Sequence, residues 1–313
     1  MLQYILRKLL FSIPVIIGVS ILVFLMIHLV PGDPARIAAG IKATDAQVEQ
    51  TRKMLGLDDP LHIQYINFVK GALVGDFGKS IRTKRPISVE LASRIPCTFQ
   101  LAFLSLIIAT TFGLILGVIS SAFRGTIIDN ITMIGALFGL SMPSFWRGLM
   151  LILLFSFVLG WFPASGYAGP FWTWEGFKHL ILPAISLGTA YTGTLARLTR
   201  SNMLEVLGQD YIRTARSKGL KERVVFFKHA LRNALISVVT VIGLSLGILL
   251  GGAMITETVF SLPGIGSLGV TAILARDYKL VQAIVMLMAT IFVIVNLVVD
   301  IIYSILDPRI KYD

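Results

Sequence analysis

The sequence predicts an all-α membrane protein with about six transmembrane helices. Of its 313 residues, 55% are hydrophobic and only 14% are charged, which is too apolar for a soluble domain of this length. The apolar residues fall into runs long enough for a helix of about 20 residues to cross a ~30 Å hydrocarbon core. Because these runs are continuously apolar, they indicate helices instead of the alternating strands of a barrel. The runs are Leu9 to Val30, Thr98 to Phe123, Ile131 to Gly160, His179 to Ala196, Ala234 to Ile255 and Leu280 to Leu306.

The first run is expected to remain in the protein as a span. It is longer than the apolar region of a signal peptide, and it ends in Val30-Pro31-Gly32-Asp33-Pro34 without a small-residue cleavage site. The only cysteine, Cys97, excludes an intrachain disulfide. We expect it to pack as a small apolar residue at the start of the second span.

The short loops place both termini in the cytoplasm, because Lys and Arg near span ends hold a loop on that side. The loop from Arg197 to Arg232 carries nine basic and three acidic residues. The basic residues near the other expected cytoplasmic ends are Arg7, Lys8, Arg124, Arg309 and Lys311. The opposing segment, Pro31 to Pro96, carries ten Lys or Arg against seven Asp or Glu, but it is too long for the rule to apply. We therefore expect it outside.

Three parts follow from this topology. Residues 1–97 form the first helix and a large extracytoplasmic loop, residues 98–307 form five helices with a cytoplasmic loop at about 199–233, and residues 308–313 form a cytoplasmic tail. Within the outer loop, apolar residues recur at helical spacing after Asp58-Asp59-Pro60, which predicts an amphipathic helix on the membrane surface. These residues are Leu61, Tyr65, Phe68, Val69, Ala72 and Leu73.

The sequence shows no pattern for catalysis, a metal or a nucleotide. Gly78-Lys79-Ser80 resembles the end of a phosphate-binding loop, but Leu73 stands where that loop needs its first glycine. The four histidines are scattered without metal-ligand spacing. The net charge of +11 flanks apolar runs, so we attribute it to anionic lipids of the bilayer and not to nucleic acid.

The cytoplasmic loop contains the most informative segment. Apolar residues between Met203 and Leu220 fit one short amphipathic helix, and Gly219 can end it because glycine tolerates the left-handed conformation of a helix C-terminus. The positions are Leu204, Leu207, Tyr211, Ala215 and Leu220. A capped helix parallel to the membrane predicts a docking element, and docking implies a partner.

Arg213-Thr214-Ala215-x-x-x-Gly219 resembles the "EAA" loop of the membrane subunits of ATP-binding-cassette (ABC) importers, with Arg213 and Thr214 where many relatives have Glu and Ala. The context, Asp210 to Leu220 and His229 to Ala234, resembles the dipeptide, oligopeptide, nickel and glutathione permease group. Further segments that agree extend the resemblance over nearly the whole chain. They are Pro31-Gly32-Asp33-Pro34, Leu55-Gly56-Leu57-Asp58, Gly75-Asp76-Phe77-Gly78, Ser141-Met142-Pro143-Ser144-Phe145-Trp146, Glu257 to Gly266 and Asp307-Pro308-Arg309.

This resemblance implies a type I ABC importer transmembrane domain, a B-type permease subunit without catalytic residues, in the inner membrane of a bacterium or archaeon. It implies a second homologous permease, an extracytoplasmic solute-binding protein and two ATPases that bind ATP and Mg²⁺, with no cofactor on this chain. The coupling residues would be Asp210, Tyr211, Arg213, Thr214, Ala215, Arg216, Lys218 and Gly219. Tyr211, Thr214 and Ala215 would form the buried face of the docking helix, Arg213, Arg216 and Lys218 its polar rim, and Gly219 its turn.

Two other classes of protein compete with this interpretation. An ion-driven secondary transporter or channel should show paired intramembrane carboxylates and two halves related by an internal repeat, and neither is visible. A membrane-bound enzyme should show a nucleophile with a base, and no such set is readable.

The solute pathway is less defined. Arg147 lies inside the third apolar run near Pro143, where an unpaired charge would cost roughly 2.5 to 3.5 kcal/mol. It can snorkel, pair with Glu257 or Asp300 as a packing clamp, or add positive potential that favours an anionic group such as a peptide carboxylate. Asn296 and Asp300 can likewise be an interhelical contact or a solute site. The resemblance leaves the solute open, because the binding protein sets most of the selectivity in this group.

Overall fold

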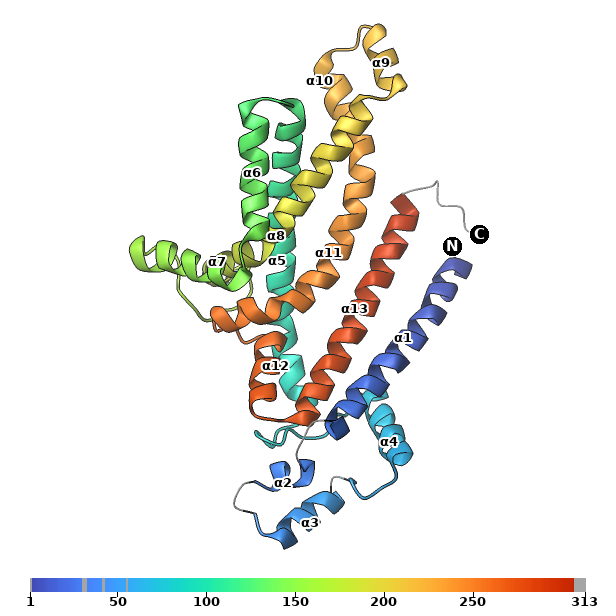
Figure 1. Cartoon of the computed structure of the whole chain (residues 1–313), viewed down its shortest axis with the longest axis vertical. Coiled ribbons are helices and arrows are strands. Elements are labelled where there is room, and N and C mark those ends of the chain that lie inside the picture. Colours follow the sequence, from blue (N-terminus) through green and yellow to red (C-terminus); the bar gives the residue numbers. More distant parts are fainter. Residues whose placement is uncertain (1, 30–32, 41–42, 55, 307–313) are drawn as a thin grey trace. The chain divides into compact units, whose positions relative to one another are not determined.

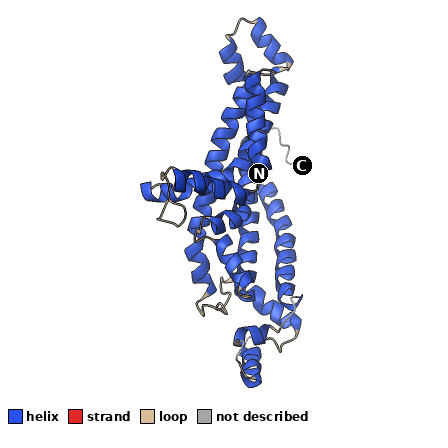
Figure 2. Ribbon diagram, turned by 60° about the vertical axis from the view of Figure 1, so that its left-hand side comes forward, coloured by secondary structure: helices blue, strands red, loops and turns tan. Residues whose placement is uncertain are grey.

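The computed structural model describes residues 2–29, 33–40, 43–54 and 56–306, and the regular secondary structure there is helical (Figure 2). One isolated antiparallel bridge joins Lys79 and Pro86. Asp307-Pro308-Arg309, the tail 308–313, Leu55 and Pro31-Gly32 lie outside the described residues. The chain divides into two compact units, which α5 and α13 both enter. The small unit comprises Leu2–Thr98 and Pro263–Ile294, and the large unit Phe99–Leu262 and the chain from Val295.

The small unit contains the first helix and the segment that follows it. Its α4 begins directly after Pro60, as predicted, and packs on α1 through a hydrogen bond of 2.8 Å between the hydroxyls of Tyr65 and Ser20. Tyr65 also meets the Phe24 ring edge to face, with centroids 5.4 Å apart. Its elements are α1 (Leu2–Leu29), α2 (Pro34–Ala39), α3 (Asp45–Met54), α4 (Leu61–Leu73), the start of α5 (Ile87–Ala122), α12 (Ile265–Leu274) and the start of α13 (Tyr278–Leu306).

The large unit is a helical bundle in which α8 packs against α6, α7 and α11. In Figure 1, α9 and α10 lie beyond the ends of α8 and α11, so the bundle carries a small helical cap. The elements are the rest of α5, α6 (Ile127–Ser141), α7 (Ser144–Leu151), the π-helical η1 (Ile152–Val158), α8 (Trp174–Leu207), α9 (Asp210–Ser217), α10 (Glu222–Val224), η2 (Val225–Leu231), α11 (Arg232–Val259) and the end of α13.

Glycines let α5 and α8 approach closely. A Cβ at Gly113 would lie 2.7 Å from the Leu195 Cβ, and one at Gly117 would lie 2.6 Å from the Ala196 carbonyl oxygen. Small residues at a helix interface permit such backbone contact inside a membrane. The two helices therefore touch without a large side chain between them at these positions.

Four helical segments in the described part of the chain are long and apolar enough to cross a membrane, and a bent pair makes up to five. The four are Arg7–Leu25, Ile87–Ala122, Glu222–Val259 and Tyr278–Ile301. The pair, Ile127–Ser141 and Ser144–Val158, bends by 106° beside Pro143, so the third apolar run is a broken helix. The fourth run lies within α8, which is 34 residues long and is not among these candidates. The all-α membrane fold is confirmed, while the number six stays a prediction.

Cys97 is buried inside α5, with 2% of its surface exposed, in agreement with the packing role expected for it. The structure extends α5 back to Ile87, one helix that runs through the expected boundary at residue 97.

Candidate functional site

The segment expected to form one docking helix contains two. Helix α8 continues to Leu207, where Gly208 N–H donates to the Glu205 carbonyl (3.1 Å) and Gln209 N–H to the Val206 carbonyl (3.1 Å). These tight turns end α8, and Gln209 then adopts an extended conformation (φ −74°, ψ 151°) as the N-cap of α9. The single helix predicted over Met203 to Leu220 is therefore wrong. Glycine at position 208 favours the break because it is a poor helix former.

One face of α9 packs against its own chain. Ile212 is fully buried and Ala215 is 8% exposed. They form an apolar cluster, here called the coupling core, with Met203, Val225, Ala230 and Ala234. Ala215 was expected on the docking face beside Tyr211 and Thr214, but it points into this core, whereas Tyr211 and Thr214 are exposed. The helix is thus fixed to α8, η2 and α11 by the core, and its other face is open.

The open face of α9 carries polar and aromatic groups. The Tyr211 hydroxyl accepts a hydrogen bond of 3.0 Å from Asn233 Nδ2, so its ring is held in position while 44% exposed. Arg213 and Asp210 are 3.4 Å apart, with side chains 74% and 95% exposed. An ion pair this exposed adds little stability. This face is therefore available for contact with another protein.

The end of α9 is built as predicted. Gly219 has φ +76°, a left-handed conformation that glycine adopts without steric cost. Its N–H donates to the Arg216 carbonyl (2.9 Å), which closes the last turn. The Arg216 guanidinium also donates to both Glu222 carboxylate oxygens (2.6 and 3.1 Å), a bond that raises the pKa of Arg216 above its ordinary value. Lys218 is the exposed C-cap.

An ion pair with a buried carboxylate lies between α6 and α8, and sequence reasoning missed it. Arg200 donates from Nε and Nη2 to the two carboxylate oxygens of Asp129, at 2.8 and 2.7 Å. Gly125 N–H (2.9 Å) and the Ser120 hydroxyl donate to the same carboxylate. Asp129 is 4% exposed at its side chain and fully hydrogen-bonded, so the pair ties the α5–α6 turn to α8, seven residues before α8 ends. The two residues are 71 positions apart, and no local sequence pattern links them.

Arg147 is held by main-chain oxygens. Its Nε donates to the Ser186 carbonyl (2.8 Å), and its Nη1 donates to the carbonyls of Gly139 and Met142, the latter at 3.3 Å. The side chain is buried, with 7% of the residue exposed, so it does not snorkel. It joins the carbonyls at the α6–α7 break to α8, whereas the clamp among the expected alternatives used Glu257 or Asp300 as the partner. Breaks in membrane helices require such donors. A role of Arg147 in the solute pathway stays a prediction.

The other expected pathway residues lie in different settings. Glu257 is fully buried in α11 and Asp300 is half-buried in α13. Asn296 has a buried Oδ1 atom with no hydrogen-bond partner among the described residues. A role for them along a solute path stays a prediction. Within the described residues no cluster of three His, Cys, Asp or Glu could hold a metal ion.

Two family profiles match the chain. Residues 1–102 match the N-terminal membrane component of binding-protein-dependent transport systems, and residues 109–312 match the inner membrane component of the same systems. The glutathione transport system permease protein GsiC of Salmonella typhimurium strain LT2 is 44% identical over 312 residues, and the dipeptide transport system permease protein DppB of Alkalihalophilus pseudofirmus is 45% identical over 333. Each alignment covers 100% of both chains.

Solved structures agree in fold. An inward-facing conformation of the MetNI methionine ABC transporter has a TM-score of 0.58 at 19% identity, over 69% of this chain and 96% of that chain. An amino acid ABC transporter with histidines has a TM-score of 0.53 at 14% identity, over 71% and 95%. At these identities the likeness shows the fold alone.

These matches define a multi-pass inner membrane component without a catalytic role of its own, which works with ATPase and binding-protein partners. In such systems the ATPase partners bind ATP. The chain belongs to the inner membrane components of binding-protein-dependent transport systems and is a permease subunit of an ABC importer.

Proposed function

We propose that this chain forms half of the translocation pathway of an importer for short peptides or glutathione. The other half is a second homologous permease, and two cytoplasmic ATPases bind the ATP and Mg²⁺. An extracytoplasmic solute-binding protein delivers the solute, and this chain holds no cofactor. Support for the solute class comes from full-length relatives at 43 to 45% identity, which are named as glutathione and dipeptide permeases.

The observation that carries the coupling role is the two-faced packing of α9. Ile212 and Ala215 anchor the helix in the coupling core, while Tyr211, Arg213 and Thr214 remain exposed. A short helix fixed on one side and open on the other can fill a groove of an ATPase and pass its movement to α8 and α11 as a rigid body. The structure therefore supports Tyr211, Arg213 and Thr214 as docking residues and Ala215 as an anchor.

The remaining residues of this segment complete the docking element. Gly219 turns the chain away after α9, and Arg216 is fixed to Glu222 at the edge of the helix. Asp210 and Lys218 are exposed at its two ends and form the polar rim with Arg213. Hydrolysis of ATP takes place on the partner, and this chain converts ATPase closure into a rearrangement of its helices.

The proposed topology has six spans with both termini in the cytoplasm of a bacterium or archaeon. The spans are α1, α5, the broken helix formed by α6, α7 and η1, then α8, α11 and α13. Residues 31–96 are outside. Single cysteines introduced into a Cys97-free background test this arrangement. An impermeant maleimide added from outside should label position 45 and spare position 218, and labelling of 218 would contradict the topology.

Reconstituted transport tests the function. The complex of this chain with its partner subunits, in vesicles with its binding protein, should accumulate a labelled dipeptide or glutathione only with ATP. Thr214→Asp changes the exposed face of α9 and should reduce uptake at least tenfold while the subunits remain folded. Gln50→Asp, on the exposed surface of α3, is the matched control and should transport normally.

Two outcomes would overturn the proposal. Uptake by the purified chain alone under an ion gradient would favour an ion-driven secondary transporter or channel. Normal uptake by Thr214→Asp together with normal ATPase binding would remove α9 as the coupling element.

A further inference from the structure

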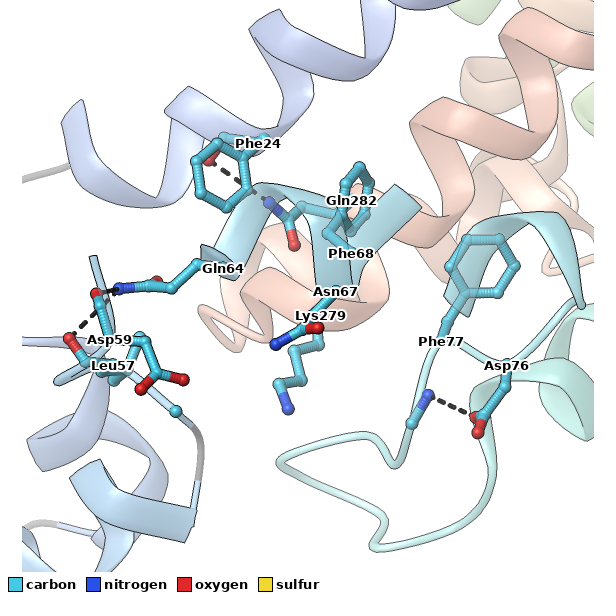
Figure 3. A pocket seen from close by; sticks show the side chains of 12 residues that line it. Phe24, Leu57, Asp59, Gln64, Asn67, Phe68, Asp76, Phe77, Lys279 and Gln282 are labelled. Carbon is cyan, nitrogen blue, oxygen red and sulfur yellow. Dashed lines mark hydrogen bonds between the residues drawn. The ribbon is translucent and has the colours of Figure 1, made fainter. Parts of the chain in front are cut away.

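A polar pocket in the small unit has no part in the coupling role. The cavity has a volume of about 250 Å³ and lies among α1, α4, the turn at residues 76–78 and the start of α13 (Figure 3). Its apolar wall is aromatic, made by Phe24, Phe68 and Phe77. The polar groups that line it are Asp59, Gln64, Asn67, Asp76, Lys279 and Gln282.

Two of the polar side chains that line the pocket form hydrogen bonds within the protein. Gln64 Nε2 donates to the carbonyls of Leu57 (3.2 Å) and Asp59 (2.7 Å), and Gln282 Nε2 donates to the Val23 carbonyl (2.9 Å). These bonds join the loop before α4 to α4 itself, and α13 to α1. They give the pocket fixed walls without involving its charged groups.

Lys279 brings a positive charge into the pocket that the fold does not neutralise directly. Figure 3 shows its side chain extended into the open space, with Asp59 on one side and Asp76 on the other. The residue is half-buried, and no carboxylate among the described residues lies within ion-pair distance of its Nζ atom. Nearby Asp277 is already engaged by the Ser80 hydroxyl (2.5 Å) and by Arg82 N–H (3.2 Å).

Other groups in the pocket also keep open hydrogen-bonding capacity. Within the described residues, neither the Asn67 amide nor the Asp59 carboxylate forms a side-chain hydrogen bond. Asp76 accepts from Gly78 N–H at 2.9 Å through one carboxylate oxygen, which leaves the second oxygen open. Gly78 has φ +75°, and a Cβ there would lie 4.0 Å from Lys279 Nζ, so the turn at residues 76–78 runs directly beside the ammonium group.

We propose that this pocket binds a small zwitterion, an α-amino acid or a very short peptide. Lys279 and the Asn67 amide would receive the carboxylate, and Asp59 and Asp76 the ammonium group. Lys279 is half-buried and Asp59 and Asp76 are exposed. A half-buried ammonium gains from a charged, hydrogen-bonded partner, and the presence of both signs in one pocket favours a ligand that carries both. Drug-sized ligands occupy pockets of about 300–1,000 Å³, so a cavity slightly below that range suits an amino acid or dipeptide.

The inference rests on the proposed function for its placement on the extracytoplasmic side and for the solute class. It adds a recognition site on the permease itself, outside the large unit. Binding at equilibrium needs no ATP, so it can be measured whether or not the complex transports.

Isothermal titration of the purified permease–ATPase complex in nanodiscs, without binding protein or ATP, tests the pocket. The probes are glycylglycine, N-acetylglycylglycine without the ammonium group, and glycylglycine amide without the carboxylate. Lys279→Met should weaken glycylglycine at least tenfold and leave the weaker binding of the amide unchanged. Asp59→Asn should weaken glycylglycine and leave the acetylated probe unchanged. Lys70→Met on α4, exposed and outside the pocket, is the matched control.

Two results would overturn the pocket: glycylglycine binding that Lys279→Met and Asp59→Asn both leave unaltered, or equal affinity for all three probes. Elution of each variant as an intact complex excludes misfolding as the cause. Lys279→Arg should retain most of the affinity, because it keeps the positive charge. A complex that binds glycylglycine through Lys279 but shows no ATP-dependent uptake would contradict the proposed function alone, and uptake without such binding would contradict the pocket alone.

Discussion

The coupling segment and the Lys279 pocket use polar residues in opposite ways. In the coupling segment, Ile212 and Ala215 are packed into the coupling core, and two arginines are paired, Arg216 with Glu222 after α9 and Arg200 with Asp129 on α8. Around Lys279, charges and amides of the same kinds line an open cavity without ion pairs among the described residues.

The difference separates a part that must keep its shape from a part that can accept a ligand. A docking helix transmits less movement if it deforms. The apolar core that anchors it should therefore be fully packed, and the charged side chains that hold the segment together should be paired. A binding pocket gains affinity when its charged groups are not already paired within the protein. Substitutions in the coupling segment should therefore reduce stability and transport together, whereas substitutions in the pocket should change binding with little effect on stability.

The largest effect is expected for Ala215→Asp. This change buries an unpaired carboxylate in the coupling core, at a cost of about 3–5 kcal/mol. The complex should unfold at a lower temperature and lose uptake. Thermal unfolding followed by tryptophan fluorescence measures the first, and vesicle uptake the second. Thr214→Asp on the exposed face should keep the wild-type unfolding midpoint, and equal destabilisation by both variants would contradict the inward orientation of Ala215.

Arg200→Met should come next, at roughly 3 kcal/mol, because it leaves the Asp129 carboxylate buried with only Gly125 and Ser120 as donors. Adding Asp129→Asn to this variant removes the orphaned charge and should restore part of the unfolding midpoint. A double-mutant cycle across the two positions gives the coupling free energy. Strictly additive single effects would show that the pair contributes nothing of its own.

Gly219→Val should cost about 1–2 kcal/mol, because a residue with a Cβ pays this amount for a left-handed conformation. Apart from the adjoining backbone, no atom lies within 4 Å of a Cβ at this position, so the cost comes from the local backbone conformation and not from contacts with other residues. Uptake and ATPase attachment should weaken while the spans remain inserted. Gly219→Asn is the matched control, since asparagine tolerates this conformation better, and it should lie between the wild type and the valine variant.

Lys279→Met should have the smallest effect on stability, within about 0.5 kcal/mol, because no ion pair is lost. The unfolding midpoint of the ligand-free complex should therefore stay near that of the wild type. With saturating glycylglycine, the wild-type midpoint should rise and that of the variant should not. A large loss of stability without ligand would place Lys279 with the structural charges of the coupling segment and remove the contrast between the two regions.

The apolar runs predicted the helical architecture well, since apolar composition and length determine where a helix can cross a bilayer. Pro60 also marked a helix start correctly, and Pro143 stands at the start of α7, because proline restricts the backbone around it. Gly219 was identifiable for a similar reason: its conformation follows from local chemistry. Features set by the backbone preference of a single proline or glycine could thus be predicted without a structure.

Features that depend on tertiary partners were not accessible. The apolar spacing of α9 could not show whether Ala215 faces its own chain or another protein, because both give the same periodicity. A carboxylate partner was one of the alternatives for Arg147, but a bent helix leaves carbonyl oxygens open, and these are its partners. Lys279 follows a loop and precedes an apolar run, a position typical of any span end, so nothing local distinguished it from a solvated lysine.

The glycine contacts between α5 and α8 limit how this bundle can move. With Gly113 and Gly117 seated against the α8 backbone, neither helix can rotate about its own axis or slide by a turn without driving side chains into the other's main chain. We therefore expect α5 and α8 to tilt together as one rigid body. A pathway would then open by movement at other places, such as the 106° bend between α6 and α7, and not by movement at the α5–α8 interface.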